Sequence, residues 1–441
     1  MSAERLFLCI FTLLGSMAAW AGPKIEQWQT SSGAKVYYVH SPELPLVDIR
    51  VVFAAGSAFD GEKPGLATLT SMLLEKGAGN WDADAIARRL ENVGARLDSE
   101  VSRDSAWLHL RSLTEPDKLE TALSTMREIL SSPRFAEQDF EREKQRLLLA
   151  LKQREESPDQ LASMMFFKAI YGNHPYAHPT EGEIESVKTI RREDLKAFHR
   201  RFYTARNGTI VIVGALSRGQ AQAVAEKLME ALPSGEPAPP IPEVGEASFA
   251  KLQHKPFPSA QTHIFTGMPA VVRGDPDYFP LYVGNHVLGG GGFTSRLVKE
   301  IREKRGLSYG VASYFLPLKQ KGPFLASLQT RNEQVEEALK VLDKTIRAYR
   351  DQGPTEEELT AAKKNITGGF VLSYDSNAKL ADYVAMIAFY GLPLDWLDTF
   401  TQKVEAVTRQ AIVEAFRRRL DPDRFKTILV GGASKVHGKE E

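Results

Sequence analysis

The sequence predicts an α+β protein with two homologous domains in tandem, each a mainly antiparallel sheet flanked by helices. Its composition is that of a globular protein, since 43% of its 441 residues are hydrophobic and 25% are charged. This length allows two domains that each bury a core. Lys plus Arg and Asp plus Glu both number 56, so we expect no nucleic-acid partner, which would need a basic surface.

A proline-rich segment divides the chain into two parts. Residues 233–242 contain five prolines in ten positions, which favours an extended polyproline conformation. We therefore expect a linker at residues 233–247. It separates an N-terminal domain at residues 22–232 from a C-terminal domain at residues 248–441.

The two domains repeat one closing unit. Residues 190–215 align with residues 408–433 without gaps, and ten of these 26 positions are identical. Each copy reads as an amphipathic helix, a turn and an apolar strand. The repeat indicates that the two domains have the same fold.

Strands and helices occur in separate blocks within the first domain. Alternating apolar residues predict strands near residues 34–40 and 46–55 and a hairpin over about residues 94–113. Helical periodicity predicts four helices, near residues 63–76, 82–92, 116–131 and 136–155. This order is typical of an α+β fold rather than of repeated βαβ units.

The N-terminus predicts a secretory signal peptide at residues 1–21. The apolar run over residues 6–14 is too short to span a bilayer, and an A-x-A cleavage site ends at Ala21. An uncleaved membrane anchor is the alternative. We expect cleavage after Ala21, a periplasmic location and no stable membrane insertion. The one cysteine, Cys9, would be removed, so the mature chain could form neither a disulfide nor a thiolate zinc site.

Several short motifs are shared with one family of peptidases. They are Gly56-Ser57, Gly65-Leu66-Ala67, His174-Pro175-Tyr176, Asp275-Pro276-Asp277-Tyr278 and the segment GGGGFTSRLVKEIREKRGLSY at residues 289–309. Through them the chain resembles the pitrilysin/insulinase (M16) metallopeptidases, including the processing peptidase. The resemblance covers almost the whole predicted mature chain. It implies that the two domains form half of a clamshell chamber.

The zinc motif of this family is degenerate here. Active members carry H-x-x-E-H on the first helix, where two histidines bind zinc and the glutamate is the general base. In this chain those positions are Thr68, Ser71 and Met72, and the region of the third ligand, a glutamate, reads Leu148–Leu151. These side chains neither hold zinc nor act as an equivalent base. The resemblance therefore implies no metal and no catalytic residue on this chain alone.

The remaining histidines and acids do not form a replacement zinc motif. His174 and His178 are four residues apart, but prolines within and after this segment prevent a helix, so we interpret it as a loop with structural histidines. Glu141 and Glu143 are expected to lie on a charged helix face and to have no chemical role.

Arg302 and Tyr309 are the second domain's candidate site residues. Gly306 is a typical helix stop, so Arg302 on the last turn and Tyr309 at the start of a strand can converge. In the family this pair faces the zinc across the chamber. An arginine can hold a substrate carbonyl, and a tyrosine hydroxyl can donate to a developing oxyanion. A surface arginine and a core tyrosine are the alternative interpretation.

Four consecutive glycines precede that pair. Gly289, Gly290, Gly291 and Gly292 lack the Lys-Ser/Thr ending of a phosphate loop and predict a mobile loop before an exposed helix start. In the processing peptidase a glycine-rich loop of the non-catalytic subunit handles substrate, so the resemblance implies substrate binding here. A simple loop at a helix start is the alternative.

Substrates of this family add as a strand to a sheet edge beside the zinc. The matching edge here is residues 94–100, where Asp98 and Ser99 replace a neutral asparagine-alanine pair. Charge on an edge strand discourages strand pairing. The N-terminal cleft is therefore not expected to bind a peptide productively.

These observations predict the non-catalytic subunit of a heterodimeric, periplasmic M16 zinc metallopeptidase. An M16 partner with an intact H-x-x-E-H motif would carry the zinc, and a peptide or unfolded protein would be the substrate. One alternative is a peptide-binding or structural protein with no peptidase partner. Another is a zinc endopeptidase with relocated ligands, although no second ligand cluster is visible. A homodimer would have no active site.

Overall fold

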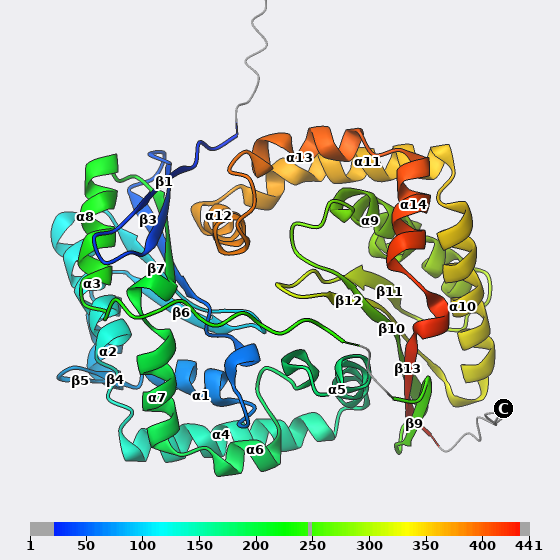
Figure 1. Ribbon diagram of the computed structural model, residues 1–441, viewed down its shortest axis with the longest axis horizontal. Helices are drawn as coiled ribbons and strands as arrows, with labels where there is room; N and C mark the ends of the chain where they lie inside the picture. Colours follow the sequence, from blue (N-terminus) through cyan, green and yellow to red (C-terminus); the bar gives the residue numbers. More distant parts are fainter. Residues whose placement is uncertain (1–21, 246–248, 433–441) are drawn as a thin grey trace, which may run out of the picture.

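The computed structural model describes residues 22–245 and 249–432. The predicted signal peptide lies outside the described residues, and so does Ala433, the last residue of the second repeat copy. The described residues form two lobes side by side, each built on one β-sheet (Figure 1). We call them the first half, before the linker, and the second half, after it.

The first half contains a six-stranded sheet with the order β1-β2-β8-β3-β7-β6. Neighbouring strands are antiparallel, except that β2 and β8 are parallel. The strands are β1 Glu26–Gln29, β2 Lys35–His40, β3 Leu46–Phe53, β6 Arg96–Val101, β7 Ala106–Leu113 and β8 Gly208–Gly214. A separate two-stranded ribbon joins β4 Gly77–Ala78 to β5 Trp81–Asp82.

The second half repeats this topology in a five-stranded sheet with the order β11-β12-β10-β13-β9. Its strands are β9 Leu252–Pro256, β10 Gln261–Val271, β11 Val311–Phe315, β12 Gly322–Arg331 and β13 Lys426–Gly431. Its one parallel pair, β13 with β9, corresponds to β8 with β2. The expected duplication is therefore confirmed, and the fold is α+β as predicted.

The helices surround the two sheets. Those of the first half are α1 Leu66–Leu74, α2 Ala83–Glu91, α3 Pro116–Ser131, α4 Glu137–Glu155, α5 Pro158–Tyr171, α6 Ile184–Thr189, α7 Arg192–Phe202 and α8 Arg218–Met229. Those of the second half are α9 Tyr278–Asn285, α10 Val335–Gln352, α11 Glu356–Phe370, α12 Asn377–Tyr390, α13 Trp396–Glu405 and α14 Arg409–Arg419. Within the described ranges, every helix falls short of the length or apolarity needed to cross a membrane.

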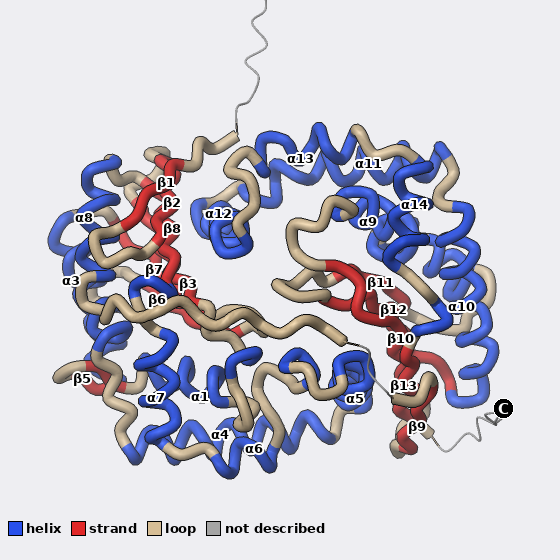
Figure 2. The backbone as a smooth tube through the Cα atoms, in the orientation of Figure 1, coloured by secondary structure: helices blue, strands red, loops and turns tan. Residues whose placement is uncertain are grey.

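One helix of each half packs on the sheet of the other half. Helix α12 lies against β3 and β8, and α5 lies against β10 and β13 (Figure 2). This exchange explains why β8 is apolar at consecutive positions. Ile210 and Ile212 join the core of the first half, whereas Val211 and Val213 join a second core that contains residues of α12. Both faces of the strand are therefore covered.

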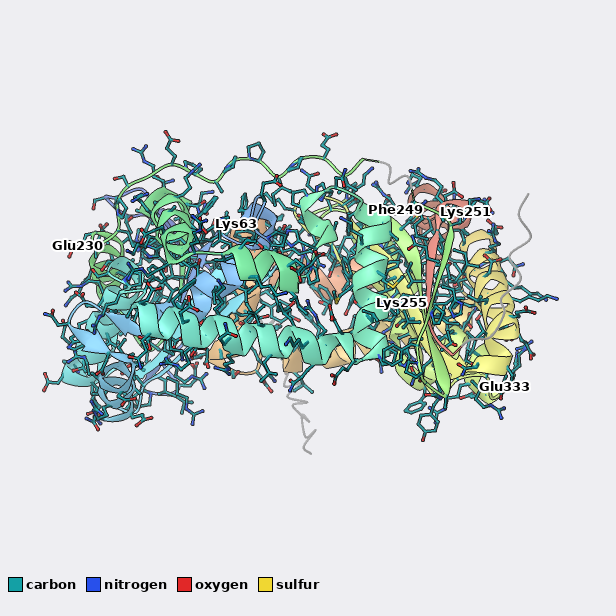
Figure 3. The ribbon with its side chains drawn as sticks, turned by 90° about the horizontal axis from the view of Figure 1, so that it is seen from below. Lys63, Glu230, Phe249, Lys251, Lys255 and Glu333 are labelled. Carbon is teal, nitrogen blue, oxygen red and sulfur yellow. The ribbon has the colours of Figure 1, made fainter. Side chains whose placement is uncertain are left out.

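The linker is fixed to both halves. Residues 233–245 have no regular secondary structure, and Glu230 and Lys251 on either side lie toward opposite ends of the molecule (Figure 3). The guanidinium of Arg201 donates to two linker carbonyls at 3.2 Å. From the second half, Gln320 Nε2 donates to a third linker carbonyl at 3.0 Å. These contacts hold the extended segment along its path.

Candidate functional site

Helix α1, which carries the degenerate zinc positions, begins on a buried carboxylate. Gly65 precedes it with a φ of 99°, a conformation that suits glycine. Asp60 accepts hydrogen bonds from the backbone N–H groups of Gly65 and Ala67, both at 2.7 Å. Burial raises the pKa of Asp60 to about 8, although these two donors oppose the shift. Asp60 therefore caps and orients the helix.

The three degenerate positions have structural contacts. Thr68 Oγ1 donates to the carbonyl of Thr180 at 2.7 Å. Ser71 is buried, and Met72 is half-buried against the core of the first half. Across residues 22–245 and 249–432, no three His, Cys, Asp or Glu side chains are grouped so that they could hold a metal. Hydroxyl and thioether side chains do not fit the zinc that this fold implies.

Helix α4, which faces α1, presents apolar residues at the region of the lost third ligand. Leu147 and Leu151 are buried there. Glu143 on this helix is only 4% exposed, which its charged stretch of sequence does not indicate. It lies on the same helix face as Phe140 and Leu147, and it accepts hydrogen bonds from Arg142 and Arg146 at 3.4 Å. These two arginines compensate its charge.

Glu75 is a carboxylate near this site that the sequence analysis missed. It follows Ser71 by one helical turn, so it extends the face of the degenerate positions. Ser99 Oγ donates to Glu75 Oε1 at 3.1 Å. Burial raises the pKa of Glu75, and the charge of Asp98 adds to this rise. The four-residue spacing between Ser71 and Glu75 could have identified this carboxylate from the sequence.

The expected edge strand is confirmed as β6, the outermost strand of its sheet. Asp98 on this strand is exposed, as its charge would require. A cavity of about 760 Å³ lies between β6, α2 and the end of α1. Its acidic residues, Glu75, Asp84, Glu91 and Asp98, outnumber its basic residues, Lys76 and Arg96.

The structure brings Arg302 and Tyr309 together. Arg302 lies in a π-helical turn, Val298–Glu303, and the chain reverses at Gly306, which has a φ of 60°. The guanidinium carbon of Arg302 is 4.8 Å from the centre of the Tyr309 ring. Tyr309 is 79% exposed. It precedes β11, so the expectation that it begins a strand is wrong by two residues.

Phe293 completes this cluster and was not singled out from the sequence. Its ring centre is 4.7 Å from the guanidinium carbon of Arg302, and Phe293 is 70% exposed. Arg302 therefore has an aromatic ring from each flanking segment, one from Phe293 and one from Tyr309. We call these three residues the Arg302 cluster.

The four glycines form a packed turn rather than an open loop. Gly289 and Gly290 end a π-helical turn that begins at His286. A side chain at Gly289, Gly290 or Gly291 would collide with neighbouring atoms. Gly292 has a φ of 62° and no neighbour where a side chain would start. Three of the four glycines are therefore tightly packed, and only Gly292, next to Phe293, has open space beside it.

Two family models match the chain. One, described as insulinase (peptidase family M16), matches residues 35–183, and the other, described as peptidase M16 inactive domain, matches residues 189–366. A crystal structure of a peptidase M16 inactive domain from Pseudomonas fluorescens is 39% identical, with a TM-score of 0.90, over 93% of this chain and 98% of its own. The chain belongs to the M16 peptidase family.

Curated relatives of this M16 chain carry two kinds of name. A non-peptidase homolog, YmxG, of Helicobacter pylori is 26% identical over 98% of this chain and 99% of its own length. An uncharacterized zinc protease of Mycobacterium leprae is 27% identical over 90% of each. A solved protease structure from Helicobacter pylori, 20% identical with a TM-score of 0.83, shares the fold. The side chains at Thr68, Ser71 and Met72 place this M16 chain with the inactive type.

The histidines of the M16 chain near this region make structural contacts. His174 Nδ1 accepts the backbone N–H of Tyr176 at 3.0 Å, and its Nε2 lies 2.9 Å from the carbonyl of Pro242. His178 Nδ1 lies 3.0 Å from the carbonyl of Pro179. Burial lowers the pKa of both histidines.

Proposed function

We propose that this chain is the non-catalytic subunit of a heterodimeric, periplasmic M16 zinc metallopeptidase. The observation that carries the proposal is the Arg302 cluster, in which a half-buried arginine lies between the exposed rings of Phe293 and Tyr309. In contrast, the positions that zinc would need are occupied by side chains with structural contacts. The chain has the Arg302 cluster, which would act on a partner's active site, and lacks the zinc ligands and the general base of its own cleft. This combination is expected of a non-catalytic subunit.

The cluster supplies two functions to a partner's active site. The guanidinium of Arg302 holds a carbonyl of the substrate peptide. The hydroxyl of Tyr309 donates a hydrogen bond to the oxygen that becomes negative when the peptide bond is attacked. The partner, an M16 chain with an intact H-x-x-E-H motif, holds the zinc and the general base. The substrate is a peptide or an unfolded protein, and the Gly289–Gly292 turn contributes to its binding.

The periplasmic location rests on the predicted signal peptide. Expression of the full-length chain in a Gram-negative host should yield a mature protein that begins at Gly22 and is released with the periplasmic fraction. N-terminal sequencing of that fraction tests this part of the proposal. A protein that retains Met1 and stays in the cytoplasm or the membrane would contradict it.

The main experiment mixes the mature chain with the M16 protein of the same genome that has an intact H-x-x-E-H motif. Association is measured by light scattering, zinc by elemental analysis, and peptide cleavage by mass spectrometry. We expect cleavage by the mixture, far above that of either chain alone, with zinc on the partner. If this chain alone binds one zinc and cleaves peptides, the proposal is wrong.

A peptide-binding protein with no peptidase partner is the second candidate. The similarity to a protein named non-peptidase homolog favours it. It predicts that the two chains do not associate and that peptide binding by this chain is unchanged when the other is added. The same mixing experiment therefore separates the two candidates.

A further inference from the structure

A cavity of about 540 Å³ lies between the two halves. The first half contributes Ser102, Arg103 and Thr180, and the second half contributes Arg273, aromatic residues of α9 and residues of β11 and the turn after it. The volume is typical of a small-ligand site. The residues that line it include two arginines and no aspartate or glutamate.

Arg103 reaches this cavity from the turn between β6 and β7. Its guanidinium stacks on the ring of Phe167, with the carbon 3.8 Å from the ring centre. Its Nε donates to the carbonyl of Tyr176 at 3.2 Å. Among the described residues, the two terminal nitrogens of Arg103 have neither a hydrogen-bond acceptor nor an ion-pair partner. The side chain is therefore held by the hydrogen bond of its Nε and by its contact with the Phe167 ring, and its terminal nitrogens are available to a ligand.

Arg273 approaches the cavity from the opposite half. Its backbone N–H donates to the carbonyl of Leu318 at 2.7 Å, and its guanidinium carbon is 5.3 Å from the ring centre of Tyr390. Its Nε is buried and has no hydrogen-bond partner among the described residues. Because this Nε is covered by protein atoms, only the terminal nitrogens of Arg273 are available to a ligand in the cavity.

The acids around these arginines are already used. Asp104 is buried and accepts hydrogen bonds from the Tyr176 hydroxyl, from the Tyr390 hydroxyl at 2.8 Å and from the Lys319 backbone N–H at 2.8 Å. Glu181, the other carboxylate close to Arg103, pairs with Arg154 at 2.7 Å. Asp104 therefore ties the halves together.

The cavity itself keeps a positive character. Arg103 and Arg273 carry two positive charges and Asp104 carries one negative charge, so the net charge of these three side chains is +1. His286, which also lines the cavity, adds no charge at neutral pH because burial lowers its pKa.

We propose that this cavity binds the C-terminal residue of a peptide that ends in an apolar amino acid. The carboxylate is held by the terminal donors of Arg103 and by Arg273, whose side chain also interacts with Tyr278 of the cavity wall. The apolar side chain packs against Tyr282, Tyr314 and Leu316, which are exposed hydrophobic residues of the same wall. Strand β11 is the outermost strand of its sheet, and Asn285 Nδ2 already donates to its edge at the carbonyl of Ser313, at 2.8 Å. An extended peptide whose end enters the cavity can therefore pair only with the end of this strand at Phe315, which lines the cavity. That edge favours a peptide over a fatty acid.

The inference rests on the proposed function only in taking a peptide as the ligand, and it is tested on this chain alone. Fluorescence anisotropy measures the binding of an eight-residue peptide that ends in phenylalanine and carries fluorescein at its N-terminus. The same peptide with a C-terminal amide is the control. We expect the free acid to bind about tenfold to a hundredfold more tightly than the amide. Equal binding of acid and amide would overturn the proposal.

Two variants assign the carboxylate site. In Arg103→Gln and Arg273→Gln the preference for the acid should fall to about twofold or less. Arg331→Gln is the matched control, because Arg331 lies at the exposed end of β12, outside this cavity, and it should keep the full preference. Circular dichroism checks that each variant folds. If Arg103→Gln does not fold, the proposal is still tested by Arg273→Gln and by the comparison of acid and amide peptides on the wild-type protein. A variant that folds and keeps the full preference would contradict the assignment.

Competition distinguishes a peptide from other carboxylates. Unlabelled peptide acid should displace the probe at a concentration at least about tenfold lower than N-acetylphenylalanine or decanoate. If either small carboxylate competes equally well, the ligand is not a peptide and the proposal fails in that part. The mixing experiment with the zinc-bearing chain remains separate. If this chain prefers the acid but the mixture neither associates nor cleaves peptides, the proposed function is refuted and this inference stands. If the mixture cleaves peptides but this chain shows no acid preference, the inference is refuted and the proposed function stands.

Discussion

The two halves have the same strand order, but they differ in what they expose. In the first half, the described large hydrophobic side chains that reach solvent are Leu44 and Leu149. In the second half, the segment after the first helix exposes Phe293 and Tyr309 on either side of Arg302. The duplicated core therefore fixes only the scaffold. Within the described residues, the first copy lacks the zinc ligands, and the side chains that we propose to act on a partner are those that the second copy leaves exposed.

The exchange of α5 and α12 makes the halves depend on each other, and the largest expected effect comes from breaking it. Phe166 on α5 is fully buried, and its ring centre is 6.3 Å from that of Phe265 in the other half. Phe166→Ala should lower the free energy of unfolding by about 3–5 kcal/mol. Urea unfolding followed by circular dichroism measures it. The control Leu149→Ala, on the exposed face of α4, should change stability by about 0.5 kcal/mol or less.

If the proposed roles of the halves are correct, substitutions in the second half should lower the activity of the heterodimer and those at the degenerate zinc positions should not. Arg302→Ala and Tyr309→Phe should each lower the turnover number by about 10²–10³-fold, the usual effect of removing a group that stabilises an oxyanion. Ser71→Ala should change it by about twofold or less, because Ser71 is only packed. Arg305→Ala is the matched control, since Arg305 pairs with Glu300 on the same turn. Steady-state kinetics of the mixture provides the comparison. A loss in Ser71→Ala equal to that in Tyr309→Phe would contradict it.

A pH effect should also separate the halves. His199 on α7 is aligned with Arg417 on α14. Burial lowers the pKa of His199 to about 4, although its hydrogen bond to the carbonyl of Leu130 at 2.8 Å opposes the shift. Stability from this histidine is present above its unfolded pKa of about 6.5 and is lost as pH falls toward 4. Arg417 stays charged throughout.

We therefore expect the wild type to lose about 2 kcal/mol between pH 7.5 and pH 5 through His199. The decrease in the free energy of unfolding of His199→Gln over the same pH range should be smaller by about this amount. Urea unfolding at both pH values measures it. Arg417→Gln should show the same pH dependence as the wild type. If His199→Gln has an unchanged pH dependence, the buried histidine is not the cause.

The sequence predicted those parts of the fold that follow from local periodicity and from repetition. The helices and strands predicted over residues 34–155 and 190–215 fell where alternating and helical patterns placed them, and the repeat at residues 190–215 predicted equal topologies. The burial of Glu143 was not predicted, because a charged residue in a charged stretch gives no local sign that its helix face is covered. The exchange of α5 and α12 depends on contacts between distant segments, which periodicity does not encode.

The candidate site was predictable only in part for the same reason. Lost zinc ligands are visible as substitutions at fixed positions of one helix, and Gly306 signalled the reversal that brings Arg302 and Tyr309 together. The inter-half cavity combines Arg103 with Arg273, which lie 170 residues apart in the sequence. Neither arginine belongs to a motif, so only the packing of the two halves reveals that their donors share one cavity.

The smallest expected effect concerns Phe293, which tests whether the Arg302 cluster acts as a unit. An exposed cation–π contact contributes about 0.5–1 kcal/mol, so Phe293→Ala should lower the turnover number of the heterodimer by about twofold to fivefold. Phe293→Tyr keeps a ring over the guanidinium and should retain activity. Because Phe293 is 70% exposed, its removal should leave the urea midpoint unchanged. If the Tyr and Ala variants are equally impaired, the ring does not position Arg302, and the two flanking aromatic residues have separate roles.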